Sequence, residues 1–257
     1  MIMKLILTQW QQFFNVSVLF FLLVPIISYA EPATVSTTIS ATIVKFSEYE
    51  QGTGTNSVTM TVTDNYLRID DSIAQTENDN GFVLYDRNEN VIYSISSEEQ
   101  QVVKIKQVPV TIASPIELKL HSVRLAEDKS APLIKGKKTQ HYQIFVNDKL
   151  CYNMISVPGL MPDVVMAMSN FNQLLAGQQA ETLRYIPADL HEACDLARHT
   201  FYPQKHFEYG FPLLFQAIDE TGQIENIKYS RALINFKKQK VSAELFVLPN
   251  YSIVPVN

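Results

Sequence analysis

Apolar and polar residues alternate at a period of two over most of the first half of the chain and much of its last quarter. This period is typical of strands that keep one face in water. Val58, Met60 and Val62, for example, are every second residue and should share one face of a strand. The pattern predicts strands or strand pairs over 39–50, 57–63, 65–70, 82–85, 91–95, 102–105, 116–126, 140–157, 211–230 and 231–249.

Short polar segments separate these strands. DRNEN (86–90) and SSEEQQ (96–101) consist of turn formers and solvated charges, so Gly81 to Ile105 is predicted to be a three-stranded meander. Asn147-Asp148 predicts a tight hairpin turn, and a second hairpin should turn at 220–222. Consecutive strands joined in this way form an antiparallel sheet.

Two segments change to a helical period. From Pro162 to Leu175 the apolar residues follow the spacing of a helix, with Pro162 at a favoured first position and Gly177 at the exit. The segment 187–199 predicts a second helix. The order of elements is therefore strands, a helical insertion at about 161–200, and strands again, which predicts an α+β fold with its helices on one face of the sheet.

The first thirty residues have the pattern of a secretory leader. Lys4 is their only charge, an apolar block covers 16–27, and the small residues up to Ala30 suit a signal peptidase. The block is shorter than a membrane-spanning helix and contains Pro25. We expect a signal peptide over 1–30, a single domain over 31–257 and no transmembrane segment after cleavage; the alternative is an uncleaved N-terminal anchor.

Composition narrows the classes of partner. The chain carries a net charge of −5 and has no basic block, which argues against binding to nucleic acid. Its two cysteines, Cys151 and Cys194, match no zinc or redox motif. In an oxidising compartment they should form a structural disulfide worth about 4 kcal/mol, and two free buried thiols are the alternative. We therefore expect a periplasmic or otherwise secreted protein.

No group of residues predicts catalysis or a metal site. His191, Asp195 and His199 recur every four residues, as metal ligands on a helix would, but they lie on the polar stripe of the predicted helix. The segment 86–97 starts like a calcium loop, yet it lacks the turn glycine and the closing glutamate. We expect no enzyme, no cofactor and no metal.

Four stretches resemble the LolA/LolB-type lipoprotein carrier superfamily, and most closely its uncharacterised exported members: SVTMTVTDNYLRID (57–70), GFVLYDRNENVIYSI (81–95), QQVVKI (100–105) and AELFVLPNYSIVPV (243–256). The resemblance implies a strongly curved antiparallel sheet, an incomplete β-barrel, with two helices covering one face or the mouth. It also implies an acyl chain or another apolar ligand. The family's Arg-Pro pair has no counterpart at Thr63-Asp64-Asn65, so its gating residues are not carried over.

A carrier of this kind needs a concave apolar face that its own side chains do not fill. Enclosing ten to twelve carbons would contribute roughly 8 to 10 kcal/mol before ordering costs. The alternative is a structural or interaction module of the cell envelope with a filled core and a protein partner. The residues predicted to line the face are Phe46, Met60, Val62, Leu67, Phe82, Leu84, Ile92, Ile95, Val165, Met168 and Phe171.

Overall fold

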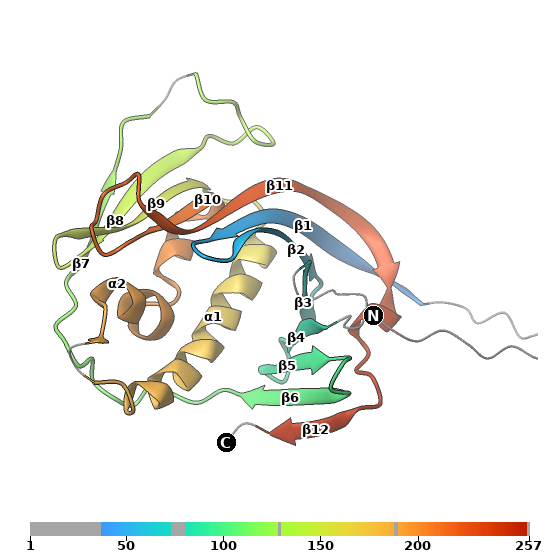
Figure 1. Ribbon diagram of the computed structural model, residues 1–257. Helices are drawn as coiled ribbons and strands as arrows, with labels where there is room; N and C mark the ends of the chain where they lie inside the picture. The colour runs from blue at the N-terminus through green and yellow to red at the C-terminus, as the bar shows by residue number, and fades with distance from the viewer. Residues whose placement is uncertain (1–36, 73–80, 128–129, 188–189, 256–257) are drawn as a thin grey trace, which may run out of the picture. The chain divides into compact units, whose positions relative to one another are not determined.

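Strands β1 (Thr38–Glu50) and β11 (Ile227–Ser242) pair along almost their whole length and form the middle of a large sheet (Figure 1). The computed structural model describes residues 37–72, 81–127, 130–187 and 190–255. Within these ranges the other strands are β2 (Gly54–Val62), β3 (Tyr66–Asp71), β4 (Phe82–Asp86), β5 (Val91–Ser96), β6 (Gln101–Lys106), β7 (Leu120–Arg124), β8 (Gln140–Val146), β9 (Lys149–Val157), β10 (Phe211–Ile218) and β12 (Ser252–Pro255).

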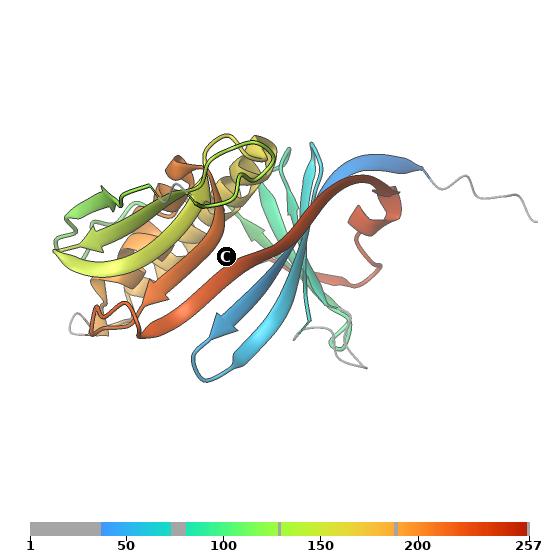
Figure 2. The same ribbon diagram turned by 90° about the horizontal axis from the view of Figure 1, so that it is seen from above.

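The twelve described strands form one sheet in the order β12-β6-β5-β4-β3-β2-β1-β11-β10-β9-β8-β7. All neighbours are antiparallel except β12 and β6, which run parallel. The described strands β12 and β7 are the two ends of this order, so they leave the barrel open. Figures 1 and 2 show the sheet curving around the long helix α1. The α+β class with a curved, mostly antiparallel sheet is confirmed.

The local chemistry of the turns explains the strand ends. The Asp86 carboxylate accepts hydrogen bonds from the amides of Asn88 and Glu89 at 2.9 and 3.0 Å, which closes the turn between β4 and β5. Asn147 and Asp148 have φ values of 52° and 62°, as the tight turn between β8 and β9 requires. The meander and this hairpin are confirmed. The strand predicted separately over 231–249 is wrong: it is the continuation of β11, which ends at Ser242.

An irregularity in register bends the centre of the sheet. Lys45 pairs with Asn235 but the next residue, Phe46, pairs with Leu233, so Ile234 is an extra residue on β11. A bulge of this kind bends its strand and increases the local twist. It contributes to the curvature that brings the two halves of the sheet around the helix.

Helix α1 (Pro162–Leu183) begins at the predicted proline but continues eight residues beyond the predicted end at Leu175. Gly177 is therefore inside the helix. A glycine occupies this helical position for a steric reason: a Cβ at residue 177 would lie 1.8 Å from the carbonyl oxygen of Val108. The irregular segment after β6 crosses the helix there, and only glycine permits this approach.

The second helical region differs from the predicted helix over 187–199. Helix α2 comprises only Ala193–Leu196, and a π-helical turn, η2 (Ala197–Phe201), continues it. Two 3-10 helices occur further along, η3 (Lys205–Tyr209) and η4 (Ala243–Phe246). Cys194 in α2 forms the predicted disulfide with Cys151 in β9, with the Cα atoms 5.4 Å apart. The disulfide is confirmed, and it attaches the helical region to the sheet.

The predicted leader and its cleavage after Ala30 lie outside the described residues. No helix in the described part of the chain is long and apolar enough to cross a membrane.

Candidate functional site

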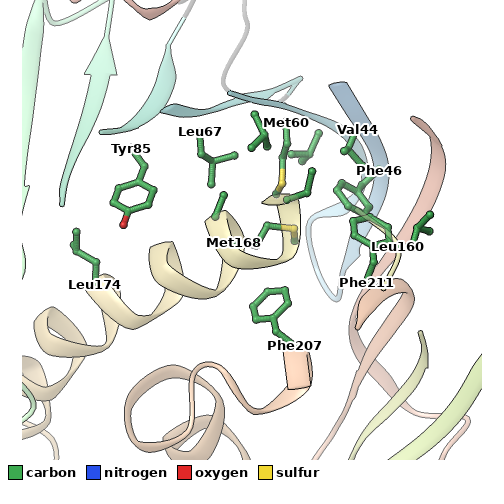
Figure 3. Packing of buried hydrophobic residues seen from close by; sticks show 14 of the residues in the cluster. Val44, Phe46, Met60, Leu67, Tyr85, Leu160, Met168, Leu174, Phe207 and Phe211 are labelled. Carbon is green, nitrogen blue, oxygen red and sulfur yellow. The ribbon is translucent and has the colours of Figure 1, made fainter. Parts of the chain in front are cut away.

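Most of the predicted apolar residues meet between the sheet and α1 (Figure 3). Met168 on α1 packs against residues of strands β1 to β3, and the rings of Phe171 and Tyr85 pack in a T-shaped arrangement at a centroid distance of 6.0 Å. Eight of the eleven predicted residues belong to this cluster or pack against it: Phe46, Met60, Val62, Leu67, Ile92, Val165, Met168 and Phe171.

The other three, Phe82, Leu84 and Ile95, belong to a different cluster, which η4 and the residues after it cover. Their placement on the same face as the rest is therefore wrong. The physical reason is the pleat: adjacent strand residues point to opposite faces, so Tyr85, which faces α1, leaves Leu84 on the other side. Ile95 is three residues from Ile92, and an odd separation also places the two on opposite faces.

The residues of the first cluster fill the space between the sheet and α1. Phe46 and Leu67 have no exposed surface, and Met60 and Met168 are 2% and 3% exposed. Close packing of this kind is normal for a protein interior. The apolar face predicted from the sequence is therefore part of a packed core.

A cavity of about 180 Å³ adjoins this core and shares Met168, Leu175 and Phe207 with it. It is bounded by α1, by the region of η2 and η3, and by β10 and β11. Its lining combines apolar, amide, imidazole and guanidinium groups. The lining residues are Met168, Asn172, Leu175, Gln179, Arg198, His199, His206, Phe207, Pro212, Phe215, Tyr229 and Arg231.

Helix α1 supplies one wall of this cavity through the helical period. Met168, Asn172, Leu175 and Gln179 are separated by four, three and four residues, so they share one stripe of the helix. This stripe adjoins the face that packs into the core, which explains why Met168 contacts both.

Aromatic rings hold Arg198 in the opposite wall. The Cζ atom of Arg198 lies 4.9 Å from the centroid of Phe215 and 4.6 Å from that of Tyr229. A guanidinium at such distances from ring faces is stabilised by cation–π interactions. Two strands, β10 and β11, thus fix the position of a cation that comes from η2.

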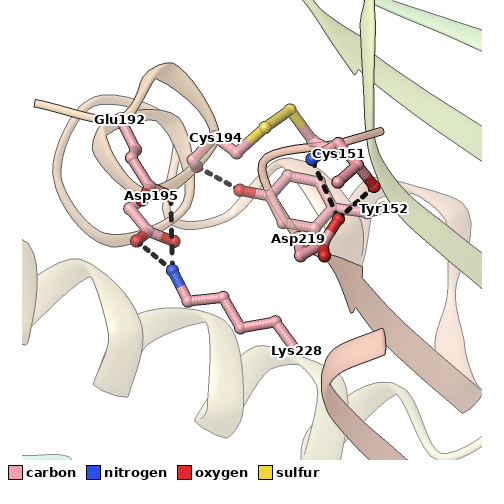
Figure 4. A network of polar contacts seen from close by, with 8 residues as sticks. Cys151, Tyr152, Glu192, Cys194, Asp195, Asp219 and Lys228 are labelled. Atoms are coloured by element: carbon pink, nitrogen blue, oxygen red, sulfur yellow. Dashed lines mark hydrogen bonds and ion pairs between the residues drawn. A yellow bond between two sulfur atoms is a disulfide. The ribbon is translucent and has the colours of Figure 1, made fainter. Parts of the chain in front are cut away.

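The other two cations of this region have carboxylate partners. Arg231 Nε donates to Glu48 Oε1 at 2.6 Å, and both side chains are largely buried. Lys228 reaches Asp195 at 2.8 Å and Glu192 at 3.3 Å (Figure 4). The Lys228 pairs connect β11 with the segment around α2. Each of them is partly exposed, so we expect little net stability from them.

The two histidines of the cavity are neutral at pH 7. Burial lowers the pKa of His206 well below its usual value, and the charges of Arg198 and Arg231 lower it further. Burial and the Arg198 charge lower the pKa of His199 to about 4, although solvent still reaches this side chain. Each imidazole can therefore both donate and accept a hydrogen bond without adding charge.

Tyr152 connects the cavity wall to the disulfide. Its hydroxyl donates to the carbonyl oxygen of Cys194 (Figure 4). Burial raises the pKa of this tyrosine, so the hydroxyl stays protonated and remains a donor. The bond fixes the start of the helical region that continues to Arg198.

His191, Asp195 and His199, which the sequence places on one polar stripe of a helix, do not come together as a group of metal ligands. His191 precedes α2, Asp195 pairs with Lys228, and His199 lines the cavity. Among the residues that the structure describes, no group of three or more His, Cys, Asp or Glu side chains could hold a metal ion.

Sequence reasoning missed Arg198 and Arg231 as site residues. Arg231 stands directly before the apolar strand residues Ala232, Leu233 and Ile234, and Arg198 follows directly after Leu196 and Ala197 on the apolar side of the predicted second helix. Either position was a signal that a cation faces the interior. Their meeting depends on the hairpin from β10 to β11 and on the disulfide, and neither local pattern predicts it.

No protein-family model matches this sequence, and no curated protein matches it.

Several solved structures resemble the chain in fold. An uncharacterized conserved protein from Thermus thermophilus has 12% identity and a TM-score of 0.42, covering 86% of this chain and 92% of that one. PNGF-II has 9% identity and a TM-score of 0.41, covering 85% and 31%. MucB of Pseudomonas aeruginosa in complex with MucA has 8% identity and a TM-score of 0.38, covering 82% and 56%.

The chain thus spans less than two thirds of the length of PNGF-II and MucB. No sequence family is shown for the chain, and the resemblance to the LolA/LolB-type carriers that was drawn from the sequence motifs stays a prediction. These similarities concern the course of the chain and not any function.

Proposed function

We propose that the chain is a non-catalytic binding domain of an extracytoplasmic protein, and that its ligand occupies the cavity between α1, η2–η3 and β10–β11. The cavity itself carries the proposal, because it is a hollow of about 180 Å³ with both apolar and polar walls. Small-molecule sites combine such an apolar lining with a few fixed polar groups. The ligand expected from the sequence, an apolar molecule between sheet and helices, is kept in modified form: it has one apolar part and one polar part.

The size of the cavity limits the ligand. An apolar cavity of about 150 Å³ accommodates benzene. Pockets for drug-sized ligands measure about 300–1,000 Å³. At about 180 Å³ this cavity suits a molecule of roughly one ring with one substituent, and not an acyl chain of ten to twelve carbons.

The lining supports binding rather than catalysis. Among the described residues it contains no serine, threonine, cysteine, aspartate or glutamate, so the common nucleophiles and carboxylate bases are missing from these walls. Burial raises the pKa of Tyr229 and lowers that of both histidines, which leaves all three neutral at pH 7. These groups suit hydrogen bonding to a ligand.

The disulfide supports an extracytoplasmic location. A Cys151–Cys194 bridge persists where the surroundings are oxidising, as in the periplasm or outside the cell. The leader-like first thirty residues agree with export.

The proposal is tested by filling the cavity. We would measure binding of a panel of neutral and charged one-ring compounds by protein NMR, using the wild type, Leu175→Trp and Met166→Trp. Leu175 lines the cavity, whereas Met166 is nine residues away, exposed, and on the opposite face of α1. Leu175→Trp should abolish binding, and Met166→Trp should retain it. Binding that survives Leu175→Trp, or no binding by any compound at concentrations up to about 10 mM, would overturn the proposal.

A second candidate is an interaction module that uses the edge of the sheet at β12. The observation is an exposed apolar C-terminal segment, in which Val247, Ile253 and Val254 are 64%, 57% and 40% exposed. An edge strand also offers backbone groups for pairing with a partner strand. Replacing Ile253 and Val254 by serine should weaken capture of a protein partner while ligand binding in the cavity continues.

A further inference from the structure

Among the residues that the structure describes, Arg198 is a cavity-facing cation without a carboxylate partner. In the described part of the chain no carboxylate forms an ion pair with its guanidinium, which contacts the rings of Phe215 and Tyr229 instead. A partly buried charge is costly unless it is paired. The cavity beside Arg198 is the place where an external partner could supply the missing negative charge.

The neighbouring acids are already used by other cations. Glu48 binds Arg231 at 2.6 Å, and Asp195 and Glu192 bind Lys228 at 2.8 and 3.3 Å. Because these carboxylates are paired with Arg231 and Lys228, and the two histidines are neutral, none of these groups neutralises the positive charge of Arg198. The electrostatic preference of the cavity is therefore for an anion.

The apolar residues of the lining indicate which uncharged group the cavity could accommodate next to the anion. Met168, Leu175, Phe207 and Phe215 present apolar surface to the same hollow. A side chain such as methionine adapts to ligands of different outline, and aromatic rings pack against flat groups. Since the volume is about 180 Å³, the apolar part is compact.

We propose that Arg198 binds the carboxylate of a small monocarboxylate whose compact apolar body, such as a single ring, packs against the residues of α1, η3 and β10. This inference rests on the proposed function and adds the chemical class of the ligand. The planar guanidinium matches a carboxylate through two parallel hydrogen bonds. His199, His206, Asn172 and Gln179 line the same space and offer further neutral donors.

The test compares benzoate with benzamide, which has nearly the same shape and no charge. Affinities are measured by protein NMR titration for the wild type, Arg198→Gln and the control Arg184→Gln. Arg184 is an exposed arginine at the C-terminal end of α1, so its substitution removes the same charge away from the cavity. Charged hydrogen bonds typically change affinity by roughly 10-fold to 100-fold.

The wild type should bind benzoate at least about 10-fold more tightly than benzamide, and Arg198→Gln should lose this preference. Arg184→Gln should behave like the wild type. The NMR spectrum without ligand shows whether Arg198→Gln is folded; if it is not, Arg198→Lys takes its place, and a severalfold loss for benzoate is expected because the planar fork is gone.

Equal affinities for benzoate and benzamide, or an unchanged benzoate affinity in the Arg198 variants, would overturn carboxylate recognition and leave the binding function standing. No binding of any one-ring compound to the wild type would overturn both. The two proposals can therefore fail separately.

Discussion

Gly177 on α1 and Val108 in the segment after β6 approach so closely that a Cβ at residue 177 would lie 1.8 Å from the Val108 carbonyl oxygen and 2.7 Å from its carbonyl carbon. Because both atoms belong to the backbone, a side-chain rotation cannot relieve the overlap. The contact fixes the crossing segment against the helix that forms one wall of the cavity.

Gly177→Ala should therefore destabilise the protein, although alanine is the better helix former. Overpacking in an interior costs about 1–3 kcal/mol and sometimes more. Chemical unfolding measures the effect. Met166→Ala on the exposed side of the same helix should change the free energy of unfolding by no more than about 0.5 kcal/mol. A neutral or stabilising Gly177→Ala would show that the segment does not cross the helix here.

Removing the disulfide should destabilise the fold and loosen the helical region that carries Arg198. Cys151 and Cys194 close a long loop, and the chain-entropy estimate for its contribution is about 4 kcal/mol. The measurement is urea unfolding of the wild type and of the Cys151→Ser, Cys194→Ser double variant. A loss below about 0.5 kcal/mol, which is typical of neutral surface changes, would contradict a structural role.

Tyr152→Phe removes the buried hydrogen bond to the Cys194 carbonyl without changing the ring. The carbonyl is then left without this donor, which costs about 1–3 kcal/mol. Tyr185→Phe is the matched control, because Tyr185 is 87% exposed. Thermal unfolding should separate the two variants by several degrees. Equal melting temperatures would show that the Tyr152 bond contributes nothing.

Stability should fall as the pH falls below about 6.5, the usual value for histidine. In the folded protein the pKa of His206 is lowered by its burial and by Arg198 and Arg231, so between the two pKa values the unfolded chain binds more protons. The same sign holds for His199, with its pKa of about 4. His206→Gln should flatten the dependence of melting temperature on pH below about 6.5. An unchanged profile would argue against a buried neutral His206.

The period of two predicted the strands well, because strands with one wet face display their pleat in the sequence. Asn147-Asp148 likewise predicted its hairpin, since few residues adopt positive φ at both central positions. Which face meets α1 was harder to predict. In β4 and β5 both faces are apolar, and the cover over Leu84 and Ile95 comes from the distant segment around η4.

The helix ends and the cavity depend on contacts that are remote in sequence. By local rules Gly177 predicts a helix end, but α1 continues past it, and the glycine is there because the backbone of Val108 leaves no room for a side chain. Helix α2 begins only at Ala193, and Leu190, which the helical pattern places on its apolar side, is 66% exposed and so gains little from packing in the core. Arg198 in η2 and Tyr229 in β11 are distant in sequence and come into contact only when the sheet has formed.

The most direct test of the ligand site is a crystal structure of the protein with 4-iodobenzoate, in which anomalous scattering locates the iodine atom. The predicted result is one iodine peak inside the cavity, among Met168, Leu175 and Phe215, with the carboxylate in hydrogen-bonding distance of Arg198. An empty cavity in crystals that contain the compound, or iodine found only at other surfaces, would contradict the account.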